Sequence, residues 1–243
     1  MEIDKYIKYG RKYSVLFERH GQNYPFIRVN GGGVLHTIPN WVDKTLHDWA
    51  GGLLGGLGLI GLGPGGLIVG YICGAYIAST AASMPNNHQN YKLPNLIPGN
   101  NSQNQIGVDH NLMLNATIVS GHVQSDFDYI LQTLKTHGYE PTREMDCVWL
   151  NKLVKEANAL NAGDENQLFS ICNKFTEANC RSIMTNTISQ ICKATMINQV
   201  NSIVSVAESN TNDLANSDQK TILLQALAVL RYSSNYWYLN LVG

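Results

Sequence analysis

The sequence predicts a mainly α-helical protein, in which a glycine-zipper helical hairpin precedes a C-terminal helical bundle and a short β-hairpin lies near the N-terminus. Three observations support this fold class. Apolar residues recur at helical spacing from about residue 123 onward. Glycine is concentrated in one uncharged stretch, and small residues recur there at every fourth position. We predict four regions: an N-terminal region (1–48), the glycine-zipper hairpin (49–84), an Asn-rich linker (85–122) and the helical bundle (123–243).

The N-terminal region is expected to contain a short hairpin followed by an amphipathic helix. Apolar and polar residues alternate loosely over 12–29, as they do in paired strands. The stretch "IPNWVDKTLHDWAGG" then begins a helix, for which Asn40 is a suitable N-cap residue. On this helix Trp41, Leu46 and Trp49 would share one broad face.

The glycine-rich stretch has the pattern of two closely packed helical arms. Eleven of the 22 glycines lie between Trp49 and Met84, and Pro64 with its flanking glycines predicts a turn between the arms. Glycine costs ~1 kcal/mol relative to alanine in a solvated helix, a loss that is offset where a flat face lets another backbone approach. The small residues at a spacing of four are Gly51 and Gly55 in the first arm, and Gly66, Gly70, Gly74, Ala78 and Ala82 in the second.

This spacing indicates tight helix packing but does not distinguish lipid from protein. Residues 66–83 would form a helix of ~27 Å, close to the ~30 Å thickness of a hydrocarbon core. Trp41 and Trp49 precede the stretch, at positions that suit a membrane interface. Three interpretations stay open: insertion into a membrane, a hairpin buried within the protein or an oligomer, and an irregular loop packed on the bundle.

The stretch "GGLLGGLGLIGLGPGGLIVGYICGAYIAS" resembles the glycine-zipper segments of bacteriocin-like peptides and of many uncharacterised bacterial proteins. Three further stretches, "HNLMLN", "DFDYIL" and "LRYSSNYW", resemble the helical tails of such uncharacterised proteins. The resemblance implies no established activity.

Five helices are predicted in the C-terminal bundle. The first two cover about 125–138 and 142–160, and the third begins after Asp164. The longest covers roughly 180–208, and the last begins near Asn216 or Ser217. The last helix is expected to bury Leu223, Ala226, Leu227, Leu230 and Trp237.

The sequence predicts no catalytic, cofactor-binding or metal site, and we expect the protein not to be an enzyme. The residues that come closest to forming such a site are polar, and a strand or loop is predicted between His110 and His122. They are Asp109, His110, Asn111, His122, Asp126 and Asp128. The separation of His110 and His122 does not fit a paired metal ligand. The five cysteines form no CxxC motif, and we expect small core thiols, with Cys172 on an apolar helix face.

Charge limits the partners and the expected location. Charged residues make up 14% of the chain and the net charge is −1, so no field recruits nucleic acid. The expected partners are a lipid bilayer, further copies of the chain or another protein. The first twenty residues carry charges throughout, unlike a signal peptide. We expect secretion without a standard signal or membrane association, with the cytoplasm as the alternative.

The leading functional prediction is a membrane-interacting or pore-forming bacterial toxin-like protein that acts through its glycine-zipper hairpin. The alternative is a soluble structural or protein-interaction subunit whose hairpin is buried in the fold or in an oligomer. An enzyme comes third, because it would require a pocket lined by the polar residues between His110 and Asp128.

Overall fold

The fold is mainly helical, as predicted, throughout the part of the chain that the computed structural model describes. The described residues are 38–58, 74, 90–96, 98–120, 156 and 159–243. They form six helices and no strand: α2 (Asn40–Gly58), α4 (Asn104–Ser120), α7 (Glu165–Cys172), α8 (Ala178–Ile191), α9 (Ile197–Asn212) and α10 (Asp218–Leu241). The predicted N-terminal hairpin, the predicted helix over 125–138 and most of the one over 142–160 lie outside these ranges.

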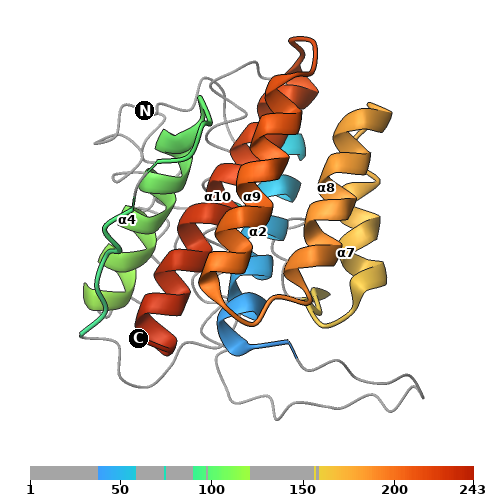
Figure 1. Cartoon of the computed structure of the whole chain (residues 1–243). Helices are drawn as coiled ribbons and strands as arrows, with labels where there is room; N and C mark the ends of the chain where they lie inside the picture. Colours follow the sequence, from blue (N-terminus) through green and yellow to red (C-terminus); the bar gives the residue numbers. More distant parts are fainter. Residues whose placement is uncertain (1–37, 59–73, 75–89, 97, 121–155, 157–158) are drawn as a thin grey trace, which may run out of the picture.

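The helices pack side by side as a bundle (Figure 1). Helix α10 contacts α2, α4, α8 and α9, and it is therefore the centre of the arrangement. Helix α4 flanks it on one side, whereas α7 and α8 lie on the other (Figure 1). Helix α7 packs on α8 and also contacts α2, so α2 has α10 and α7 as neighbours.

Local capping explains where two of the helices begin. The Asp164 side chain accepts a hydrogen bond from the backbone N–H of Asn166 at the start of α7. The Ser217 hydroxyl accepts one from the backbone N–H of Lys220 at the start of α10. Both starts agree with the sequence prediction, because a short polar side chain can satisfy the first free N–H groups of a helix.

The single long helix predicted over 180–208 is wrong, since the structure divides it into α8 and α9. The chain turns at 192–196, where the N–H groups of Lys193 and Ala194 bond the carbonyls of Gln190 and Ile191. The Gln199 side chain then accepts hydrogen bonds from the backbone N–H of Thr195 and Met196. A glutamine that reaches back over one turn has replaced the Ser, Thr or Asp that usually marks a helix start.

Helix α4 lies where the sequence suggested a linker. Its apolar residues Ile106, Met113, Leu114 and Ile118 follow a helical period and are buried. Asp109, His110 and Asn111 lie between them and are also buried, so the apolar pattern in the sequence is interrupted by polar residues. The predicted boundary between residues 48 and 49 likewise falls inside one continuous helix, α2.

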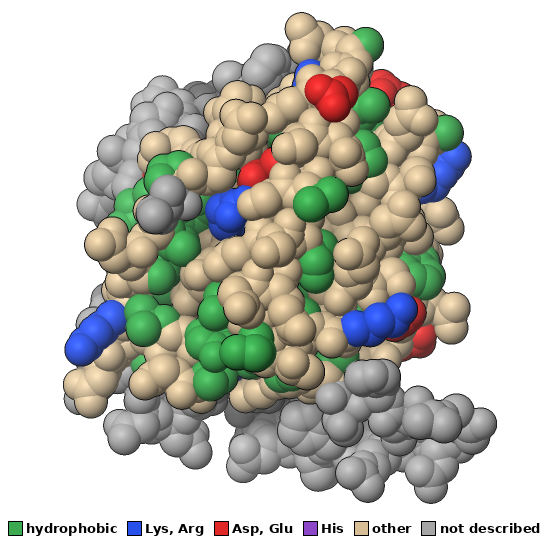
Figure 2. Space-filling model, viewed as in Figure 1, with side chains coloured by type: hydrophobic (Ala, Val, Ile, Leu, Met, Phe, Trp, Pro, Cys, Tyr) green, Lys and Arg blue, Asp and Glu red, His purple; other side chains and the backbone are tan. Residues whose placement is uncertain are grey.

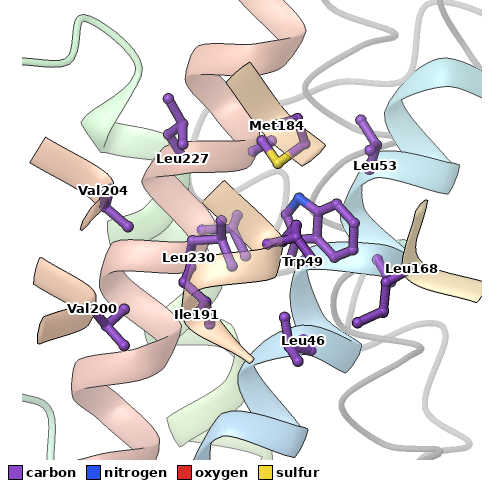
Figure 3. Close-up of a cluster of buried hydrophobic side chains, with 14 of the residues drawn as sticks. Leu46, Trp49, Leu53, Leu168, Met184, Ile191, Val200, Val204, Leu227 and Leu230 are labelled. Carbon is purple, nitrogen blue, oxygen red and sulfur yellow. The ribbon is translucent and has the colours of Figure 1, made fainter. Parts of the chain in front are cut away.

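Helices α2 and α10 are buried on nearly all sides. Burial is continuous along α10 from Ile222 to Ser234, and along α2 from Trp41 to Ala50 except at Asp43. Helices with no solvent-facing side belong to the interior of a bundle. Figure 3 shows the Trp49 ring among apolar side chains from the neighbouring helices, including Leu168, Met184, Ile191 and Leu230. The face of the molecule in Figure 2 is dominated by uncharged polar groups, with a few scattered charges.

Backbone segments approach closely at one point of the glycine-rich stretch. A Cβ atom built on Gly74 would lie 2.0 Å from the carbonyl oxygen of Gly51 and 3.0 Å from the Cα atom of Gly55. Real Cβ contacts are not this short, so only glycine fits at Gly74 without a backbone shift. The structure describes three members of the predicted zipper, namely Gly51, Gly55 and Gly74. The other four lie outside the described residues: Gly66, Gly70, Ala78 and Ala82.

We expect Gly74→Ala to destabilise the protein. The added methyl group meets rigid backbone, and overpacking of this kind costs about 1–3 kcal/mol, which outweighs the gain in helix propensity. Gly163→Ala is the control, because its Cβ would meet only the Asn161 side chain, at 3.3 Å. Urea unfolding followed by circular dichroism measures both variants. Equal stabilities for the two variants would contradict the close approach.

Candidate functional site

A buried carboxylate joins three helices near the middle of α2. Asp48 has no exposed surface, and its Oδ2 atom accepts hydrogen bonds from Ser233 Oγ at 2.5 Å and from Trp237 Nε1 at 2.8 Å. His110 of α4 places its Nε2 atom 3.6 Å from the same oxygen. Both donors belong to α10 and His110 belongs to α4, so one α2 side chain makes polar contact with two other helices. We call Asp48, Lys44, His110, Ser233 and Trp237 the Asp48 cluster.

Lys44 completes the cluster one helical turn before Asp48. It is 3% exposed, and its ammonium nitrogen lies 5.1 Å from the centroid of a Trp237 ring, within range of a cation–π interaction. Burial lowers the pKa of Lys44, and the carboxylates of Asp48 and Asp43 oppose this shift. The positive charge of Lys44 is thus disfavoured by its surroundings but balanced by nearby negative charge.

Further polar contacts fix α4 against α10 beside the cluster. The Asn111 amide donates to the backbone carbonyl of Tyr232 at 2.8 Å, and its oxygen lies 3.1 Å from Nδ1 of His110. The Tyr236 hydroxyl donates to Asn115 Oδ1 at 3.1 Å. Burial raises the pKa of Tyr236, and the negative charge of Asp48 adds to this effect. These contacts hold the His110 ring in place next to Asp48.

A second buried charge pair lies elsewhere in the bundle. Glu208 of α9 is 1% exposed, and its Oε2 atom lies 2.6 Å from Arg231 Nη2 of α10. Glu208 also accepts from Asn101 Nδ2 at 3.2 Å, and Arg231 donates to Ser205 Oγ at 2.9 Å. This pair therefore joins α9, α10 and the segment that leads into α4. It involves no residue of α2, which distinguishes it from the Asp48 cluster.

The geometry of the Asp48 cluster stabilises the buried charge of the Asp48 carboxylate. Ser233 donates to Asp48, and the 3.6 Å separation of His110 Nε2 from that carboxylate exceeds hydrogen-bond length. Hydrogen bonds to charged groups stabilise by about 1.5–3 kcal/mol each, whereas an uncompensated buried charge costs several kcal/mol. The donors from α10 are accordingly what allows Asp48 to remain in the interior.

The predicted interfacial residues are buried in this structure. Trp49 is 0% exposed, and Trp41 packs edge-on against Tyr238 with ring centroids 5.1 Å apart. Their predicted role at a lipid interface stays a prediction for a membrane-bound state. Of the predicted zipper residues, Gly51, Gly55 and Gly74 come together, as described above.

The polar residues around His110 lie in a helix, which corrects the predicted strand or loop. Asp109, His110 and Asn111 are buried, whereas His122, Asp126 and Asp128 lie outside the described residues. Sequence reasoning missed that Asp48 lies beside His110 and accepts a hydrogen bond from Ser233. The available signal was a charge inside an apolar pattern: Asp48 lies between Leu46 and Trp49 on the predicted amphipathic helix, and such a charge needs a partner.

Three cysteines confirm the expected core thiols. Cys172, Cys180 and Cys192 are buried and unpaired, while Cys73 and Cys147 lie outside the described residues. Burial raises the pKa of Cys172 to about 12 and those of Cys180 and Cys192 to about 11. Because the thiolate is the reactive form, these side chains are poor nucleophiles in the folded state.

Within the described ranges, no set of three His, Cys, Asp or Glu side chains is placed to bind a metal ion. No helix there has both the length and the apolar character needed to cross a bilayer. No protein-family model, curated protein or solved structure matches this chain.

We expect Asp48→Asn to lower the free energy of unfolding by about 3 kcal/mol, because the change removes the negative charge that balances the buried Lys44 ammonium and that the donors of α10 stabilise. Asp164→Asn makes the same chemical change at a helix N-cap, where asparagine is about as favourable as aspartate. Urea denaturation with tryptophan fluorescence compares the two variants. A difference below about 0.5 kcal/mol would show that the cluster contributes little.

The raised pKa of Cys172 predicts a loss of stability at alkaline pH. In the unfolded chain the thiol ionises near its ordinary value of 9.0, whereas in the folded protein it stays neutral until about 12. The stabilising effect is therefore complete below pH 9.0 and is lost as the pH rises toward 12. The free energy of unfolding, measured from pH 8 to 11, should fall more steeply for the wild type than for Cys172→Ala. Parallel curves would contradict the shift.

Proposed function

We propose that this chain is a membrane-interacting or pore-forming, toxin-like protein, and that its glycine-rich segment (49–84) is the membrane-active element. The observation that carries the proposal is the placement of α2. The second half of this helix is the beginning of the segment, and it is enclosed by the bundle, with the Gly74 backbone against Gly51 and Gly55.

Close packing of glycine faces serves two environments equally well. It needs no polar contact, so the same faces can pair inside a protein or inside lipid. A segment without charged residues between Trp49 and Tyr91 requires cover in water, and the bundle supplies it for α2. In the proposed mechanism, Gly66, Gly70 and Gly74 of neighbouring copies pair after insertion, while leucine and isoleucine side chains face the lipid.

A second candidate function is a structural or protein-interaction subunit in which the glycine-rich hairpin stays packed in the fold. One observation favours it, namely the burial of both Lys44 and Asp48 within α2. Ionised side chains are expensive in hydrocarbon, and partners from α10 hold them here. On this reading α2 is a permanent core helix, and the protein has no activity toward bilayers.

Gly70→Leu tests the membrane proposal at the predicted zipper. The wild type should float with vesicles of phosphatidylcholine and phosphatidylglycerol and release an encapsulated dye. Poorer helix packing that costs about 1–3 kcal/mol corresponds to a decrease of roughly fivefold to a hundredfold in leakage and in oligomer formation. Val69→Leu is the matched control, because it adds volume at the neighbouring position, outside the small-residue stripe.

The outcomes separate the two candidate functions. Leakage that falls for Gly70→Leu and persists for Val69→Leu supports the membrane mechanism. Leakage that is unchanged in both variants shows that the zipper does not mediate it. A folded wild type that neither floats nor releases dye would rule out the membrane proposal in favour of the interaction subunit.

A further inference from the structure

We propose that the Asp48 cluster is an autoinhibitory contact, which keeps α2 inside the bundle and thereby controls the release of the glycine-rich segment. This inference deepens the proposed function and rests on it for its biological meaning. Its structural part, the control of α2 by Asp48, is tested separately below.

The contact is placed where it can control the glycine-rich segment. Helix α2 runs without a break from Asn40 to Gly58, so Asp48 and the glycines from Gly51 onward belong to one helix. Asp48 is only three residues before Gly51. A helix moves as a rigid element over so short a distance, so the polar contacts of Asp48 also hold the first arm of the segment.

The partners of Asp48 make the position of α2 conditional on two other helices. The hydroxyl of Ser233 and the indole N–H of Trp237 come from α10, and the imidazole of His110 comes from α4. If α10 moves away, the buried carboxylate loses both of its hydrogen-bond donors, and if α4 moves away, it loses the neighbouring imidazole of His110. An unpaired buried carboxylate is strongly unfavourable, so α2 would then leave the interior. The cluster therefore favours two states, one with α2 bound and one with α2 released.

Apolar packing alone would not produce this behaviour. The contacts of Leu46, Trp49 and Leu53 are non-directional and weaken gradually as helices separate. The hydrogen bonds to Asp48 depend steeply on distance and angle. The sharpness of the proposed release thus comes from the hydrogen bonds of Asp48, which the surrounding apolar contacts do not replace.

The Glu208–Arg231 pair provides a matched control within the same bundle. Both carboxylates are at most 1% exposed, and both lie in contact with α10. Glu208, however, belongs to α9, and its hydrogen-bond partners among the described residues are Asn101 and Arg231, neither of which lies in α2. Asp48→Asn and Glu208→Gln therefore remove the same kind of buried charge, but only the first change affects the contact of α2.

Hydrogen exchange of the full chain, read by mass spectrometry, tests the control of α2. Asp48→Asn should accelerate exchange of the α2 amides on the order of a hundredfold, whereas Glu208→Gln should leave them within about threefold and accelerate exchange in α9. If Asp48→Asn does not fold, Ser233→Ala gives the milder test, with an expected acceleration in α2 of about tenfold. Equal effects of the Asp48 (or Ser233) and Glu208 variants on α2 would overturn the inference, as would no effect of either.

Flotation with the same phosphatidylcholine and phosphatidylglycerol vesicles links this contact to function. Selective exchange in α2 together with stronger flotation of Asp48→Asn than of Glu208→Gln supports both the inference and the proposed function. Selective exchange without flotation of any variant retains the control of α2 but overturns its autoinhibitory role and the membrane function. Flotation of the wild type without selective exchange overturns the inference and leaves the membrane function standing.

Discussion

The burial of one carboxylate, that of Asp48, is the constraint on which the arrangement of the central helices depends. A charge with no exposed surface is tolerated only where polar groups are fixed around it. Here the two hydrogen-bond donors come from α10, and the His110 ring of α4 lies 3.6 Å away. The positions of three helices are therefore coupled through one oxygen atom. Apolar side chains around Trp49 supply most of the favourable burial, but they do not specify which helix stands next to which.

Charge is scarce in this chain, and the few buried charges are placed with particular partners. The Asp48 cluster joins α2, α4 and α10, while the Glu208–Arg231 pair joins α9, α10 and the segment before α4. Both include α10, which explains why this helix is buried along most of its length despite carrying Arg231 and several hydroxyl groups. Directional polar contacts thus complement a core whose apolar packing is not selective.

The glycine-rich segment and the polar cluster act on the same helix in different ways. The glycines of α2 allow another backbone to approach, as it does at Gly74, and this contact is independent of charge. Asp48, only a few residues away, makes contacts that exist in the bundle alone. Helix α2 therefore has a glycine face that can pack in protein or in lipid, and a carboxylate, Asp48, whose hydrogen-bond partners are found in the bundle. That combination is the physical basis for the proposed release of α2.

The sequence by itself determined the helical class, the starts of α7 and α10, the inward positions on α10 and the core character of the three described cysteines, because these follow from local capping and from the 3.6-residue period. It also indicated close packing around Gly51, Gly55 and Gly74. Only the tertiary structure decided that α4 is a helix, that the chain turns between α8 and α9, and that Asp48 meets His110 and Ser233. The buried polar residues of α4 and of the segment before it resemble linker residues in the sequence. Asn101, His110 and Asn111 have Glu208, Asp48 and Tyr232 as neighbours, which lie more than sixty positions away along the chain.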